Sequence, residues 1–178
     1  MANMPNTLLF MTLGADYTNH TVFALPMDGT DKPERLMSGL VDEAHVSPDG
    51  RWLAYISTES GRWEVYVEPF RRRGERLLVS NNGGGQPRWR SDGKEFFYLS
   101  LEGALMSLSV RESGTGLDLG IPTMLIPADR LKLAMQGPDY DDWDVAPDGQ
   151  RFLMKVSAAP IEKRRIYVLL NSPSLLER

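Results

Sequence analysis

Cysteine is absent from this chain of 178 residues, which excludes disulfide bonds, thiolate-ligated metal sites and a cysteine nucleophile. Histidine is scarce: the two copies are His45 and His20, and we expect His20 to lie in a turn of an outer strand. A Gly-x-Ser-x-Gly segment is also lacking, so the sequence gives little support to a Ser-His-Asp triad. These absences direct the search for function away from nucleophilic catalysis by side chains.

Long apolar runs are lacking as well. No segment approaches the roughly 18 apolar residues that a membrane-spanning helix requires. The first residues show neither the basic segment nor the apolar core of a secretory signal. The net charge of −4 is modest and gives no footprint for nucleic acid. We therefore expect a cytoplasmic protein that binds neither membranes nor nucleic acids.

Hydrophobic residues make up 42% of the chain, and 16 glycines and 12 prolines are spread among them. The hydrophobic content and the length support one folded domain with its own core. The many turn-forming residues favour short strands joined by turns over long helices. We therefore expect an all-β fold.

A short pattern that occurs three times predicts the architecture. An Asp-Gly pair, which suits a sharp turn because Asp can hydrogen-bond its own backbone and Gly tolerates positive φ, precedes an apolar and aromatic run. The copies are 47–57 (SPDGRWLAYIS), 90–100 (RSDGKEFFYLS) and 146–156 (APDGQRFLMKV). Asp49, Asp92 and Asp148 are separated by 43 and 56 residues, and the first spacing is typical of a four-stranded propeller blade.

The repeat predicts a β-propeller segment of about four blades in a single domain that spans 1–178. The second and third blades read as complete four-stranded sheets, whereas the first lacks its innermost strand and the fourth its outermost. Three consecutive glycines at 83–85 favour a flexible crossing between blades over a phosphate-binding loop, because a strand and not a helix follows them. The expected blades are about 7–38, 42–80, 85–127 and 140–172.

These stretches resemble the TolB-type β-propeller repeat, whose signature is an apolar or aromatic residue, then Ser-Pro-Asp-Gly, then a strand of the Leu-Ala-Tyr kind. The sequence is most similar to the C-terminal propeller region of bacterial serine/threonine protein kinases. The similar segments are 47–70, 86–93, 146–152 and 167–171. The resemblance covers nearly the whole chain and implies a sensor or interaction module. It implies no phosphotransfer, because the His-Arg-Asp and Asp-Phe-Gly motifs of a kinase are absent.

The resemblance also bears on assembly, because the closed propellers of this family have more blades than the four expected here. Open terminal blades would expose sheet faces and edges, which natural proteins avoid. We therefore expect a homo-oligomer. The simplest form is a two-fold dimer that joins through its terminal blades and completes an eight-bladed ring.

The innermost strand of each blade lines the central channel of a propeller, so alternate residues of these strands are candidates for a site. Counting back from each turn aligns two sets of residues: Glu43 with Gln86 and Asp142, and His45 with Arg88 and Asp144. Carboxylates and an imidazole are ligands for a divalent ion, so the metal candidates are Glu43, His45, Asp142 and Asp144. The expected pocket wall comprises Gln86, Arg88, Tyr140 and Trp143. A solvated channel without a ligand is the alternative interpretation and the favoured one.

Two functions follow from these features. The first is a non-catalytic propeller module that binds a protein or a small-molecule ligand. The alternative is a metal-dependent hydrolase of phosphoesters, phosphotriesters among them, or of lactones and other esters, in which the metal activates water in the channel of a dimer. The sequence identifies no cofactor with certainty, and a divalent metal ion is the candidate. No catalytic residue is assigned.

Overall fold

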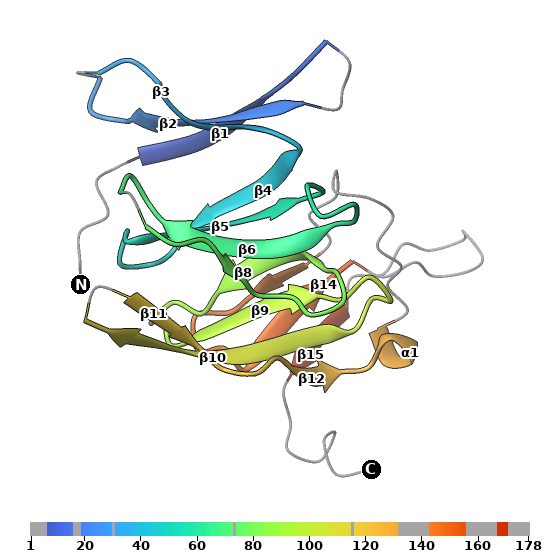
Figure 1. The fold of residues 1–178 in the computed structure, drawn as a ribbon. Coiled ribbons are helices and arrows are strands. Elements are labelled where there is room, and N and C mark those ends of the chain that lie inside the picture. Colours follow the sequence, from blue (N-terminus) through green and yellow to red (C-terminus); the bar gives the residue numbers. More distant parts are fainter. Residues whose placement is uncertain are drawn as a thin grey trace.

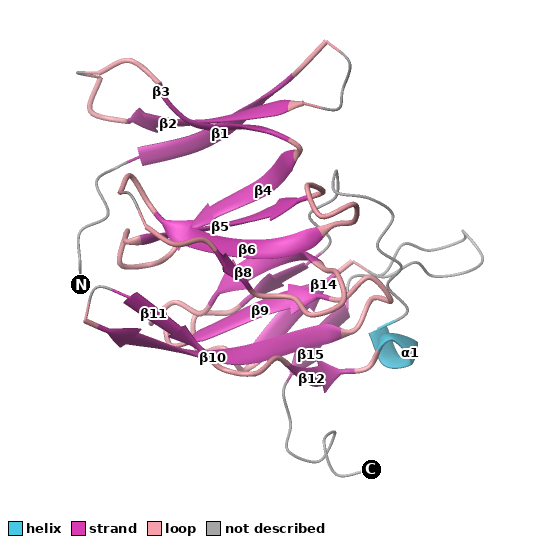
Figure 2. Ribbon diagram, viewed as in Figure 1, coloured by secondary structure: helices cyan, strands magenta, loops and turns pink. Residues whose placement is uncertain are grey.

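Four antiparallel sheets follow one another through the chain and stack face to face (Figures 1 and 2). This computed structural model describes residues 7–15, 19–29, 31–72, 74–114, 116–131 and 143–155, and the backbone of 167–170. Within these ranges the one helix is a single short turn. The prediction of an all-β chain built from propeller blades is confirmed.

We refer to the sheets as blades 1 to 4. Blade 1 consists of β1 (Thr7–Leu13), β2 (His20–Pro26) and β3 (Glu34–Gly39). Blade 2 consists of β4 (Val41–Val46), β5 (Trp52–Ser57), β6 (Glu64–Pro69) and β7 (Leu77–Leu78). Blade 3 consists of β8 (Gly85–Trp89), β9 (Glu95–Leu99), β10 (Leu105–Ser113), β11 (Gly116–Leu119) and β12 (Thr123–Ile126). After α1 (Ala128–Leu131), blade 4 consists of β13 (Trp143–Val145), β14 (Arg151–Met154) and β15 (Tyr167–Leu170).

Apolar side chains fill the space between each pair of neighbouring blades. Along β5, Trp52, Ala54 and Ile56 pack toward blade 3, whereas Leu53 and Tyr55 pack toward blade 1. The middle strand of blade 3, β9, alternates in the same way between blades 2 and 4. A strand that is buried on both faces reads as a continuous apolar run, which is why the sequence reveals these two strands so clearly.

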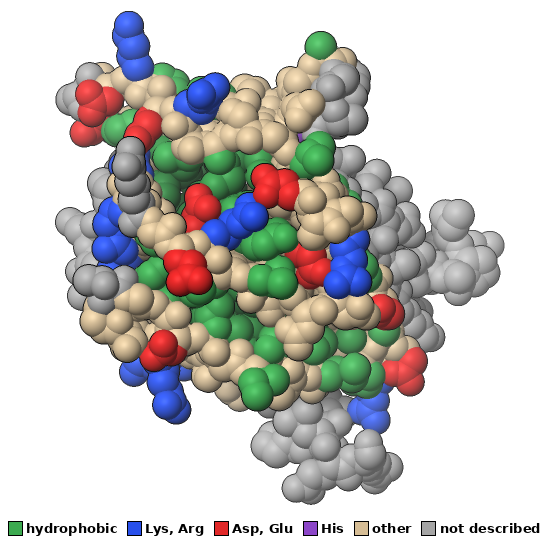
Figure 3. All heavy atoms as spheres, in the orientation of Figure 1, with side chains coloured by type: hydrophobic (Ala, Val, Ile, Leu, Met, Phe, Trp, Pro, Cys, Tyr) green, Lys and Arg blue, Asp and Glu red, His purple; other side chains and the backbone are tan. Residues whose placement is uncertain are grey.

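The outer surface of the blades is charged. In the centre of Figure 3, side chains of both signs lie over β6 and β7, with hydrophobic side chains visible between the sheets. Arg76 pairs with Glu59 at 2.7 Å and stacks over the ring of Tyr66 at 4.6 Å. Such exposed pairs contribute little stability, so the buried faces carry the fold.

The three repeated turns have one hydrogen-bond pattern. In each copy the Asp carboxylate accepts the backbone N–H two residues later, at 2.9 to 3.1 Å. The following glycines, Gly50, Gly93 and Gly149, have φ of +75°, +69° and +70°. The predicted chemistry of the turn is therefore confirmed, and side chains other than glycine would be strained at these positions.

The crossing at 83–85 is buried and closely packed, in contrast to the flexible crossing that we expected. The buried carboxylate of Glu64 accepts the N–H of Gly83 at 2.9 Å and also the hydroxyl of Ser80. A Cβ on Gly84 would lie 2.7 Å from the ring of Tyr98, too close for any other side chain. Gly84 is therefore required by the close approach of the backbone to the ring of Tyr98.

One strand was not predicted. The apolar run that indicates β10 ends at Val110, but the strand continues to Ser113, turns at Gly114 and returns as β11. Charged residues on this extension, Arg111 and Glu112 among them, interrupt the apolar pattern. The extension projects beyond the repeat, so periodicity gives no signal for it.

The turn of blade 3 contains a carboxylate, Asp92, whose charge should affect the stability of the fold at low pH. Two hydrogen bonds from the guanidinium of Arg90 lower the pKa of Asp92 to about 2 from 3.8, against the opposing effect of its slight burial. Because the pKa is lower in the folded state, the ionised Asp92 stabilises the fold at pH values above 3.8. This stabilisation is lost as the pH falls from 3.8 toward 2. Asp92→Asn should lower the free energy of unfolding at pH 7 by about 0.5–1 kcal/mol, a value that allows for solvent screening.

Urea denaturation of the wild type and the variant at pH 7 and pH 3 measures this difference, which should narrow at pH 3. Asp118→Asn, on the exposed face of β11, is the matched control and should change stability at neither pH. An equal difference at both pH values for Asp92→Asn would show that the charge is not the cause.

Candidate functional site

The innermost strands β4, β8 and β13 carry most of the predicted site residues and lie next to one another. Both β4 and β8 contain a β-bulge, between Asp42 and His45 in one and between Gly85 and Arg88 in the other. The bulged residues Glu43 and Gln86 have φ of +50° and +54°, in the left-handed region. Such a conformation costs about 1–3 kcal/mol for a residue other than glycine, so the surrounding contacts must maintain it.

Glu43 provides one of these contacts. Its carboxylate accepts the backbone N–H of Gln86 at 2.5 Å. Gln86 is fully buried, and its N–H lies at the bulge of β8. Glu43 therefore holds the equivalent position of the next blade in place, and this structural task occupies one of its carboxylate oxygens.

His45, Arg88 and Asp144 also meet, one from each of three successive blades. Arg88 Nη1 lies 2.9 Å from His45 Nε2, and Arg88 Nε lies 3.9 Å from an oxygen of Asp144. A guanidinium can only donate, so Nε2 of His45 is the acceptor and the ring carries its proton on Nδ1. The three residues that the repeat aligns thus form a chain of polar contacts from blade 2 to blade 4.

Arg88 is the centre of this chain and is only 8% exposed. It donates to the carbonyls of Pro87 at 2.9 Å and Trp143 at 3.3 Å, and its guanidinium lies 5.7 Å from the centre of the Trp143 ring. A buried charge needs such hydrogen bonds and a partner of opposite charge, here Asp144, to offset the loss of water. The expected pocket-wall residues Arg88 and Trp143 therefore contact each other directly.

The metal-site hypothesis stays a prediction. Asp142 and Tyr140 lie outside the described residues, and in the described part of the chain no group of three or more His, Asp or Glu residues is arranged to hold a metal. Where the site is described, the lone pair of His45 Nε2 accepts from Arg88. A metal at this nitrogen would have to displace a buried cation.

The polar contacts extend to blade 1 through residues that sequence reasoning did not select. His20 Nδ1 lies 3.3 Å from Asp42 Oδ2, and both side chains are less than 10% exposed. The expectation that His20 lies in a turn is wrong, since it is the first residue of β2. Its pairing with Asp42 joins blade 1 to the innermost strand of blade 2.

Among the residues that the structure describes, no helix has the length and apolar character of a membrane span.

Comparisons with known proteins place the fold among solved propellers. No protein-family model matches the sequence, and no curated protein matches it. TolB from Acinetobacter baumannii is similar in structure with a TM-score of 0.63 at 18% identity, over 93% of this chain and 38% of that one. A protein described as TolB from Agrobacterium tumefaciens has a TM-score of 0.55 at 17% identity, over 91% of this chain and 57% of its own.

These similarities support a TolB-like β-propeller fold. The chain spans 38% and 57% of the length of the two proteins, so it corresponds to a part of each. At this level of identity the likeness concerns the fold alone. The more specific resemblance to the propellers of kinases stays a prediction.

The central role of Arg88 can be tested by truncation. Arg88→Ala should lower the free energy of unfolding by about 2–3 kcal/mol, because several charge-assisted hydrogen bonds across three blades are lost. Urea denaturation at neutral pH measures the change. The control is Arg111→Ala, an exposed arginine on β10, which should change stability by less than about 0.5 kcal/mol. Equal small effects for both variants would contradict the structural role of Arg88.

Proposed function

We propose that this chain is a β-propeller binding module that acts through assembly and not through catalysis, and that a second copy of the chain covers the outer face of blade 1. The observation that supports the proposal is an apolar sheet face without a neighbour among the described residues. The comparison with TolB structures supports the propeller architecture on which the proposal rests.

The face belongs to β1 and β2. Phe10 and Phe23 are paired across the two strands, and their rings stack at 5.2 Å; Leu8 is paired with Leu25 on the same face. Alternation along the strands directs these four side chains away from blade 2, toward which Leu9 and Val22 point, among others. Leu8 is 47% exposed, and Phe10, Phe23 and Leu25 are partly exposed, so this apolar face is accessible to solvent.

The other interfaces indicate what covers such a face. Between blades 1 and 2, 2 and 3, and 3 and 4, apolar side chains of one sheet pack on those of the next. Phe10, Phe23, Leu8 and Leu25 form an apolar group like those of the buried faces, although Arg35 lies beside Phe23 on the neighbouring strand. Another blade is therefore the partner that fits it best.

A second copy can supply that blade. Blade 4 exposes Leu153 at 48% on β14, on the side of the strand opposite to Phe152 and Met154, which pack toward blade 3. A two-fold axis would bring blade 1 of each copy against blade 4 of the other and close a ring of eight blades, a number within the common range of propellers. Each copy then contributes both contact faces, as a closed symmetric assembly requires.

The first test is the mass in solution. We expect light scattering to give about twice the 20.0 kDa of one chain. Phe10→Ser and Leu8→Arg should each weaken association at least about 30-fold, because a central apolar contact is lost or a charge is buried. Leu8 is half exposed, so Leu8→Arg leaves the fold of the separate chain intact.

The matched control is Ile121→Ser, which removes an apolar side chain that is 83% exposed elsewhere on the molecule and should leave the dimer unchanged. Circular dichroism verifies that every variant is folded. A wild type that stays monomeric at high concentration would contradict the proposed partner. A dimer that both face variants leave intact would place the interface elsewhere.

The second test separates binding from hydrolysis. The assembled wild type, with and without added divalent metal, is assayed on a phosphotriester, a phosphodiester and a lactone. We expect no turnover above background, because His45 and Glu43 are engaged in contacts between blades. Turnover that requires a metal and disappears in the Glu43→Ala and Asp144→Ala variants would support the hydrolase hypothesis and contradict a purely binding role.

A further inference from the structure

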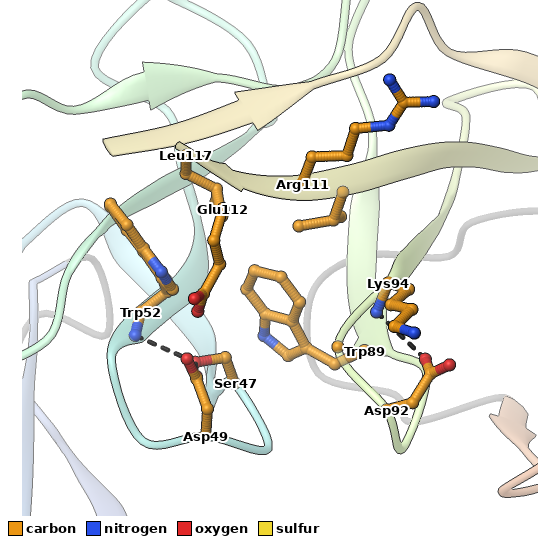
Figure 4. Close-up of a pocket in the computed structure, with 11 residues that line it drawn as sticks. Ser47, Asp49, Trp52, Trp89, Asp92, Lys94, Arg111, Glu112 and Leu117 are labelled. Atoms are coloured by element: carbon orange, nitrogen blue, oxygen red, sulfur yellow. Dashed lines mark hydrogen bonds between the residues drawn. The ribbon is translucent and has the colours of Figure 1, made fainter. Parts of the chain in front are cut away.

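A cavity of about 610 Å³ lies at the end of the molecule where the repeated turns gather (Figure 4). The turn of blade 2 forms one side, with Ser47, Asp49 and Trp52. The turn of blade 3 forms the other side, with Trp89 and Asp92 among its residues. The hairpin of β10 and β11 covers the space between them. The volume lies within the range of about 300–1,000 Å³ that is usual for small-molecule sites.

The hairpin of β10 and β11 is fixed over the cavity by two contacts with blade 2. Leu117 on β11 is 8% exposed and belongs to the apolar cluster that contains Trp52 and Val110. Glu112 on β10 pairs with Arg51 at 2.5 Å. These contacts connect a strand extension of blade 3 to the turn of blade 2. The cavity therefore has a packed roof.

Two tryptophans line opposite sides of the cavity, and their indole nitrogens differ. The Nε1–H of Trp89 donates to the carbonyl of His45 at 3.3 Å. Trp52 is 3% exposed, and its Nε1 has no hydrogen-bond partner among the described residues. Figure 4 shows Trp52 beside Glu112, and this nitrogen is itself buried. A buried indole N–H without an acceptor is costly, and a bound acceptor would satisfy it.

The charges around the cavity are balanced. Asp49 and Glu112 both interact with Arg51, and Asp92 is paired with Arg90. Figure 4 shows the guanidinium of Arg111 turned away from the two tryptophans. Asp49 and Glu112 share one arginine, and Lys94 and Arg111 add positive charge to the lining. Acids and cations around the cavity are therefore similar in number, so it has no strong preference for an ion of either sign. It still presents carboxylate oxygens as acceptors and an indole N–H as a donor.

We propose that this cavity binds a neutral sugar of one or two rings. The hydroxyl groups of a sugar both donate and accept, so they can donate to Glu112 and Asp49 and accept from the indole N–H of Trp52. Its apolar C–H faces can lie against the indole ring of Trp89, which is partly exposed. An ionic ligand would compete with Arg51 or with the carboxylates that Arg51 holds. This site is separate from the face of blade 1 and does not depend on the proposed dimer.

The experiment is an NMR titration of ¹⁵N-labelled protein, which follows the indole N–H signals of the four tryptophans. The probes are glucose, galactose, N-acetylglucosamine and cellobiose, with choline as a cation and benzoate as an anion. We expect at least one sugar to shift the Trp52 and Trp89 signals with a Kd of about 1 mM. The shifts should then approach saturation at a sugar concentration of about 10 mM. The signal of Trp143, in blade 4, should not move.

Glu112→Gln should weaken binding about tenfold, the effect of losing a hydrogen bond to a charged acceptor, and leave the fold intact because the side chain is 48% exposed. The matched control is Glu102→Gln, an exposed carboxylate in the turn between β9 and β10, which should bind like the wild type. Absence of saturable shifts with every sugar would overturn the proposal. So would binding of choline or benzoate in place of a sugar, or equal weakening by both variants.

Discussion

Burial of both faces of each sheet is the constraint on which this structure depends. Blades 2 and 3 carry apolar side chains toward both neighbours, so neither sheet is stable in water alone. The same constraint explains the stacking of Phe10 on Phe23 at one end of the chain, where a face of this kind has no covering sheet among the described residues. Folding and the assembly proposed above therefore meet the same requirement, the removal of apolar sheet faces from water.

Polar residues on the innermost strands contact one another between neighbouring blades. Successive blades repeat the same backbone path, so residues at equivalent positions of the repeat become neighbours in space. His45 contacts Arg88, and Glu43 contacts the backbone of Gln86, because the two residues of each pair hold equivalent positions on the innermost strands of neighbouring blades. Buried polar groups require partners, and the nearest candidates are their own equivalents in the next blade. The contacts that resemble a site in the sequence therefore serve first to fix one blade on another.

The parts of the chain that depart from the repeat carry its individual features. The extension of β10 and the strand β11 belong to blade 3 but pack on Trp52 of blade 2, and the cavity exists because they do so. Repeated elements build the scaffold and additions to it provide specificity, as is common where loops lie on a rigid framework. The inner strands repeat along the chain and were therefore the expected site, whereas the hairpin of β10 and β11 does not repeat and leaves no such signal.

The sequence by itself determined the turns, the strands that they begin and the alignment of the blades. The reason is that Asp92 and Gly93, like their equivalents, act on backbone groups within a few residues, and that doubly buried strands such as β5 leave a continuous apolar run. Only the tertiary structure decided that Arg88 occupies the lone pair of His45, that the glycines at 83–85 are buried and that Trp52 faces a cavity. These facts depend on distances between blades, which are set by the packing of side chains far apart in the chain and leave no local pattern.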